Sequence, residues 1–146
     1  MKRFLFLIAV CSAFVSCNIN AKTETETPVQ KEVTVKDHVE VLYFHGKQRC
    51  ATCMAIERNT KAALQENFAD QLKKGSVVFK VIDISKAENE KLADKYEVTW
   101  SSLFVVKYKN GKETHKNMTE FAFGNARKSP DAFKVGVVKA INEMLK

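Results

Sequence analysis

The four cysteines are the residues of this 146-residue chain with the clearest chemistry. Two of them, Cys50 and Cys53, are separated by two residues, a spacing that places both thiols on one face of a helical turn. Two thiols held in this way can close into a disulfide, and the thiolate of one can attack a disulfide in another molecule. The pair therefore predicts thiol–disulfide exchange.

The other two cysteines lie in an N-terminal leader. Residues 1–17 begin with two cations, continue through an apolar stretch and end at Cys17, which is typical of a secretory signal peptide. The end of the leader resembles the lipobox of bacterial lipoproteins, in which the cysteine is acylated. We therefore predict that Cys17 is the lipidation site, that Cys11 leaves with the leader, and that the chain is exported to the cell envelope and anchored to a membrane. A soluble periplasmic or secreted protein, cleaved near Ala21, is the alternative.

The residues around the dithiol favour one activated thiol. Residues 39–45 are β-branched and aromatic, as in a buried strand, and helix formers follow from Cys50 onwards. A thiol at the start of a helix faces free backbone N–H groups and the positive end of the helix dipole, and Arg49 and Lys47 add positive charge. We therefore predict that Cys50 is the nucleophile and that Cys53 is the shielded, resolving thiol.

The rest of the chain predicts the elements that must hold this pair. Residues 18–32 are polar, which favours a flexible tether, so the folded domain is expected to span residues 33–146. The Asn110-Gly111 pair predicts a two-residue hairpin turn. The expected elements are strands at 33–35, 39–45, 76–83, 103–108 and 112–118, a helix from Cys50 to Lys74, a helix capped by Ser85 and ending at Lys95, and a helix starting at Ser129-Pro130.

This order of elements predicts an α/β domain. A strand–helix–strand unit gives a parallel pair with a right-handed crossover, and the hairpin adds antiparallel strands. The helices can then cover both faces of one small sheet. The expected fold is a three-layer sandwich with a mixed four- to five-stranded sheet and helices on both faces.

With a Cys-x-x-Cys pair at its strand-to-helix junction, the segment 35–146 resembles the thioredoxin-like superfamily. This resemblance implies disulfide exchange through Cys50 and Cys53 with a protein thiol, a protein disulfide or a redox relay component. Residues 43–53 also resemble a narrower group, the thioredoxin-like subunit attributed to nitrophenyl-compound reduction in arsenical-handling gene sets. That second resemblance implies that the dithiol supplies electrons to a partner component, with nitroaromatic arsenicals as the eventual substrate.

The sequence departs from the thioredoxin pattern beside the cysteines. Arg49 stands where an aromatic residue commonly precedes the first cysteine, and Ala51-Thr52 replaces Gly-Pro. The first strand is expected to lack the buried acid that assists proton transfer in thioredoxins. His45, Glu57 or water are the remaining candidates for that role, and His45 is otherwise a strand-end residue.

A second departure falls in the loop that carries a cis-proline in the superfamily. Residues 100–103 occupy this place and contain no proline. A hydroxyl of Ser101 or Ser102 is expected to line the site instead. Trp100 is either a residue at the rim of the site or a packing residue.

Other functions for the dithiol stay open. The pair can be a local structural disulfide, or its thiolates can hold copper(I) or trivalent arsenic in a redox-inert binding module. The three histidines are not at zinc-finger spacing, so no metal site is assigned. No glycine-rich nucleotide fingerprint is present, and we expect no cofactor.

The charge of the chain does not indicate a nucleic-acid partner. The net charge of +7 arises from 24 lysine and arginine residues set against 17 acidic residues. The two signs are interspersed and form no basic stripe alternating with aromatic residues, so we expect no binding to nucleic acid.

Overall fold

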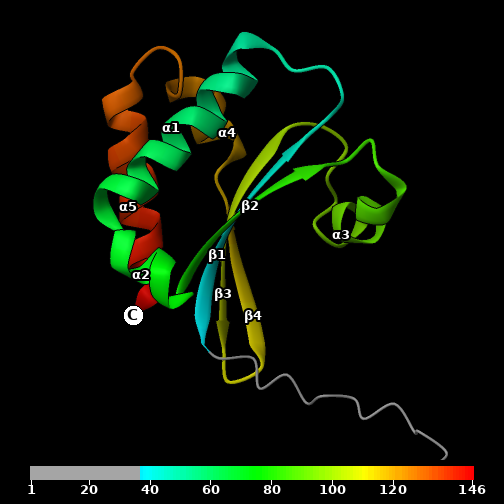
Figure 1. The fold of residues 1–146 in the computed structure, drawn as a ribbon. Helices are drawn as coiled ribbons and strands as arrows, with labels where there is room; N and C mark the ends of the chain where they lie inside the picture. Colours follow the sequence, from blue (N-terminus) through cyan, green and yellow to red (C-terminus); the bar gives the residue numbers. More distant parts are fainter. Residues whose placement is uncertain (1–36) are drawn as a thin grey trace, which may run out of the picture. The chain divides into compact units, whose positions relative to one another are not determined.

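The computed structural model describes residues 37–146, which form one four-stranded mixed sheet (Figure 1). The strands are β1 (His38–His45), β2 (Val77–Asp83), β3 (Ser102–Lys109) and β4 (Lys112–Asn117), in the order β2-β1-β3-β4. β1 and β2 are parallel, whereas β3 is antiparallel to both β1 and β4. The predictions of a signal peptide at 1–17, of lipidation at Cys17, of a tether at 18–32 and of a strand at 33–35 lie outside the described residues.

The helices cover both faces of this sheet (Figure 1). They are α1 (Ala51–Asn67), α2 (Ala69–Lys74), the short 3-10 helix η1 (Ala87–Asn89), α3 (Glu90–Lys95), α4 (Thr119–Asn125) and α5 (Pro130–Leu145). One face, which we name the α1/α5 face, packs Val41 and Tyr43 of β1 against α1, α4 and α5. The opposite face, the α3 face, packs Leu42 and Phe44 against α3 and the residues after it. The expected three-layer α/β architecture is therefore confirmed.

β1 is the central strand and is buried on both sides. Successive side chains of a strand point to opposite faces, so Tyr43 enters the α1/α5 face while Phe44 enters the α3 face. This explains why the β1 sequence is almost continuously apolar rather than alternating. The C-terminal end of β1 is consequently a fixed point from which the cysteine loop starts.

The predicted hairpin between β3 and β4 is confirmed. Asn110 and Gly111 have φ angles of 52° and 72°, and Lys109 pairs with Lys112 across the turn. Positive φ at both central residues is what a two-residue hairpin turn of this type requires, and asparagine and glycine adopt it at low cost.

The prediction of one continuous helix to Lys74 is wrong, because the chain breaks at Phe68 between α1 and α2. Phe68 has φ −132° and ψ 27°, and its ring is only 2% exposed in the core. The side-chain amide of Asn67 donates to the carbonyl of Ala63, which helps to end α1. α2 then ends at Gly75, which has φ 71°, as the predicted glycine stop requires.

The predicted helix cap at Ser85 is also wrong. Both the backbone N–H and the hydroxyl of Ser85 donate to Asp83, so Ser85 closes a turn after β2, and η1 begins two residues later. Pro130 is the first residue of α5, as expected. The hydroxyl of Ser129 makes no capping hydrogen bond there.

α4 was not predicted, and it packs directly on α5. The Phe121 ring lies against Gly136, where an added Cβ would be 2.2 Å from the ring. This contact explains why a glycine stands inside α5.

No helix among residues 37–146 has the length and apolar character needed to cross a membrane.

Candidate active site

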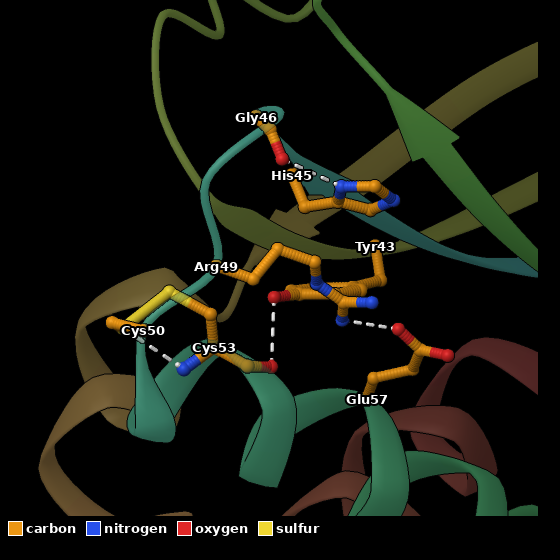
Figure 2. The surroundings of a disulfide bond; sticks show 7 residues. All are labelled: Tyr43, His45, Gly46, Arg49, Cys50, Cys53 and Glu57. Carbon is orange, nitrogen blue, oxygen red and sulfur yellow. Dashed lines mark hydrogen bonds and ion pairs between the residues drawn. A yellow bond between two sulfur atoms is a disulfide. The ribbon is translucent and has the colours of Figure 1, made fainter.

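The cysteine pair lies where β1 leads into α1 (Figure 2). Cys50 is the N-cap residue of α1, with an extended backbone, and forms a disulfide with Cys53 in the first turn. The two Cα atoms are 5.0 Å apart. The helical turn therefore brings two residues separated by only two others within bonding distance.

The two sulfur atoms have different surroundings. Cys50 is exposed, whereas Cys53 is 6% exposed and belongs to the buried residues of α1. A partner molecule can therefore reach Cys50 directly. Cys53 is largely shielded from such a partner.

The start of α1 can stabilise negative charge on Cys50. Sγ of Cys50 accepts a hydrogen bond from the backbone N–H of Cys53, with an N···S distance of 3.1 Å. The first turn of α1 contains no acidic residue that would oppose an anion. A free N–H group and the helix dipole both favour a thiolate over a thiol at this position.

Arg49 does not direct its charge at the dithiol. Its guanidinium forms an ion pair with Glu57, two turns into α1, and lies 5.6 Å from the centre of the Tyr43 ring. Figure 2 shows the side chain extending across the ring towards Glu57. Arg49 was expected to stabilise the Cys50 thiolate with its positive charge. Glu57 partly neutralises that charge.

Tyr43 joins this ion pair to the disulfide. Its hydroxyl donates to the carbonyl oxygen of Cys53 at 2.8 Å (Figure 2). Burial raises the pKa of the Tyr43 phenol, and hydrogen bonds with Arg49 and Ser101 only partly oppose this rise. The phenol thus stays protonated and acts as a donor to the first turn of α1.

Ser101 and Ser102 differ in their relation to the site. Ser101 is buried and lies close enough to Tyr43 for its hydroxyl to lower the pKa of that phenol. Ser102 donates its hydroxyl to the carbonyl of Trp100 at 3.1 Å and so stabilises its own loop. Residues 37–146 contain no cis peptide bond. Of the two serines, Ser101 is the one that acts on Tyr43, whose hydroxyl donates to the carbonyl of Cys53.

Trp100 lies on the surface rather than in the core. Its side chain is 58% exposed and packs against Phe123 of α4, with ring centres 5.2 Å apart. The two rings line an open groove of about 590 Å³ whose charged members are Glu97 and Glu120. Trp100 is therefore available to a binding partner.

His45 is not directed at the disulfide. Its Nδ1 lies 2.9 Å from the carbonyl oxygen of Gly46, and Figure 2 shows the ring turned towards that residue. The prediction that His45 influences Cys50 receives no support from this geometry.

The first strand contains a buried acid, but this acid is not placed to assist proton transfer at the dithiol. Glu40 is 7% exposed and forms an ion pair with Lys80. It points to the sheet face opposite Tyr43 and lies five residues before the end of β1, so it does not reach the dithiol. Within residues 37–146, no three His, Cys, Asp or Glu side chains are grouped as metal ligands.

Sequence comparisons identify no family for this chain. No family model matches the chain, and no curated protein matches it. Among solved structures, one described as the structure of a malarial protein shares 20% identity over 71% of this chain and 97% of its own, with a TM-score of 0.43. A thioredoxin from Thermus thermophilus shares 16% identity over 70% of this chain and 76% of its own, also with a TM-score of 0.43.

The topology itself defines the class. A β2-β1-β3-β4 sheet with helices on both faces and a Cys-x-x-Cys pair between β1 and α1 is an α/β domain consistent with the thioredoxin-like fold. This arrangement supports a redox role in general terms. The resemblance to the nitrophenyl-reducing group is not tested by the comparisons and stays a prediction.

Proposed function

We propose that this protein is a thiol–disulfide oxidoreductase that acts through Cys50 and Cys53. The observation that carries the proposal is the unequal exposure of the two sulfurs at one helix start. Cys50 is open to a partner and accepts a hydrogen bond from the backbone N–H of Cys53, while the Cys53 side chain is buried. A nucleophile needs the first environment and a resolving thiol needs the second.

In the reduced protein, the Cys50 thiolate attacks one sulfur of a partner's disulfide. A bond forms between Cys50 and that sulfur, and the partner's second sulfur leaves as a thiolate that takes up a proton. Cys53 then loses its proton to solvent and attacks the Cys50 sulfur, and the partner's first sulfur leaves as a thiolate that takes up a proton from solvent. Two electrons pass to the partner, and the protein ends with the Cys50–Cys53 disulfide seen in Figure 2. The reverse steps oxidise a partner's dithiol.

The proposed partner is a protein thiol or disulfide, or a component of a redox relay. We further propose that the chain acts in the cell envelope, held to a membrane by acylation of Cys17. A reducing role in an oxidising envelope needs a separate supply of electrons. Replacement of Cys17 by alanine in the full chain should abolish incorporation of a labelled fatty acid and move the protein from the membrane fraction to the soluble fraction. Unchanged labelling in this variant would contradict the anchor.

A redox titration of the full chain tests the dithiol. Peptide-resolved thiol labelling in glutathione or dithiothreitol buffers should show Cys50 and Cys53 converting together at a potential between about −120 and −300 mV. A pair that stays oxidised or stays reduced across that whole range would exclude the proposed activity and leave a structural disulfide.

Single cysteine variants test the order of attack. Cys53→Ser keeps the exposed nucleophile without its resolving thiol, so it should accumulate mixed disulfides with partners through Cys50. Cys50→Ser is the matched control and should accumulate far fewer, since Cys53 is buried. Equal trapping by the two variants would contradict the assigned roles.

A further inference from the structure

The ion pair between Arg49 and Glu57 joins the residue immediately before Cys50 to the second turn of α1. The side chains are 27% and 30% exposed, so the pair is only partly screened by water. Nε of Arg49 is buried without a hydrogen-bond partner. The guanidinium is therefore held by Glu57 and by the Tyr43 ring rather than by a full set of its own hydrogen bonds.

This arrangement belongs to the oxidised state, in which Cys50 carries no charge. Reduction creates a thiolate on Cys50, directly next to Arg49 in the chain. The other ionisable groups around this turn do not compete for Arg49: Tyr43 stays protonated, His45 faces Gly46, and Lys47 is a cation on the exposed loop. Arg49 thus has two possible anionic partners after reduction, Glu57 and Cys50.

We propose that Glu57 is a positioning residue that holds the Arg49 guanidinium away from Cys50 and thereby limits the stability of the Cys50 thiolate. This inference rests on the proposed function, because it concerns the reduced form of the same dithiol. A less stable thiolate makes the reduced form less favoured, so Glu57 also makes the dithiol a stronger reductant.

The test measures the alkylation rate of Cys50 by iodoacetamide as a function of pH in the reduced full chain, read residue by residue from fragment masses so that Cys53 does not contribute. Glu57→Gln removes the anion and frees Arg49. The rate below the thiol pKa should rise roughly threefold, as expected for a partly exposed ion pair. Arg49→Gln should leave the rate low.

The double variant separates the two charges. Removing the negative charge of Glu57 would stabilise a nearby Cys50 thiolate even without Arg49. Glu57→Gln is therefore compared in chains that carry Arg49 and in chains that carry Arg49→Gln. The threefold rise should shrink to a small change in the Arg49→Gln background. An equal rise in both backgrounds, or no rise with Arg49 present, would overturn the proposal.

Two further variants control for structure. Glu57→Asp keeps the charge and should retain the low rate. Glu66→Gln removes another α1 glutamate, whose ion pair with Lys134 lies at the far end of the helix, and should also leave the rate unchanged. If Glu57→Gln and Glu66→Gln behave alike while the dithiol still cycles, only this inference fails. If Cys50 and Cys53 do not cycle at all, the proposed function fails first.

Discussion

The two faces of the sheet use their polar side chains differently. On the α3 face, the Tyr96 hydroxyl donates to Glu113 at 2.9 Å, and Lys95 forms an ion pair with the same carboxylate. On the α1/α5 face, Arg49, Glu57 and Tyr43 form a similar set of contacts, but this set is bonded to the turn that carries the disulfide. The two sets contain comparable groups but differ in what lies next to them. The set on the α3 face stabilises the fold, whereas the set on the α1/α5 face adjoins a reactive sulfur.

The largest expected effect comes from breaking the α1/α5 face itself. Phe133 of α5 is fully buried in the core of the α1/α5 face, so Phe133→Ala should lower the free energy of unfolding by about 3–5 kcal/mol. Urea unfolding followed by circular dichroism measures this loss. Phe133→Leu is the milder control, and a loss below about 1 kcal/mol for the alanine variant would show that this face does not carry the core.

A smaller loss is expected where α4 meets α5. Gly136→Ala places a methyl group against the Phe121 ring, so the ring or the helix must shift, at a cost of about 1–3 kcal/mol. Gly124→Ala in α4 meets no atom within 4 Å and should instead stabilise the protein by up to about 1 kcal/mol. Thermal unfolding of both variants checks the prediction: the melting temperature should fall for Gly136→Ala and rise for Gly124→Ala.

A matched pair of tyrosine variants sharpens the comparison of the two faces. Tyr43→Phe and Tyr96→Phe each remove one hydroxyl from a hydrogen bond and should each cost about 0.5–1.5 kcal/mol of stability. Only Tyr43 is bonded to the cysteine turn, so only Tyr43→Phe should change the midpoint of the glutathione titration. An equal change in Tyr96→Phe would show that the two networks are not separate.

The smallest effect concerns acid stability on the α3 face. Burial opposes ionisation of Glu113, but the bonds from Lys95 and Tyr96 outweigh it and lower the pKa below its ordinary value of 4.5. Because the folded-state pKa is lowered, Glu113 contributes stability above its unfolded pKa, and this contribution is lost as the pH falls through the folded value. Glu113→Gln should therefore flatten the loss of stability below about pH 4.5, by less than about 1 kcal/mol, in urea unfolding at several pH values. A variant as acid-sensitive as the wild type would contradict this assignment.

Sequence patterns predicted those parts of the fold that depend on local chemistry. The Asn110-Gly111 turn, the apolar β1 strand and the stop at Gly75 each follow from backbone preferences of a few neighbouring residues. The break at Phe68 does not follow from local preferences, because it depends on the Phe68 ring entering a core built from distant elements. α4 was missed for a similar reason, since its seven residues are held by packing on α5.

The candidate site shows the same division. The cysteine spacing and the helix start were readable, because both lie within one continuous segment. The pairing of Arg49 with Glu57 over the Tyr43 ring could not be predicted from the sequence, because it requires β1 and α1 to meet in a particular orientation. Ser101 influences the pKa of Tyr43 from 58 positions away in the sequence, and no local pattern encodes that proximity.

The helix cap at Cys50 links folding to electron transfer. The sulfur that accepts the Cys53 N–H is the same atom that exchanges bonds with a partner. A thiolate accepts such a hydrogen bond more strongly than a disulfide sulfur does, so the first turn of α1 is better capped after reduction. By thermodynamic linkage, the folded chain should hold electrons more firmly at this dithiol than an unfolded peptide with the same two cysteines.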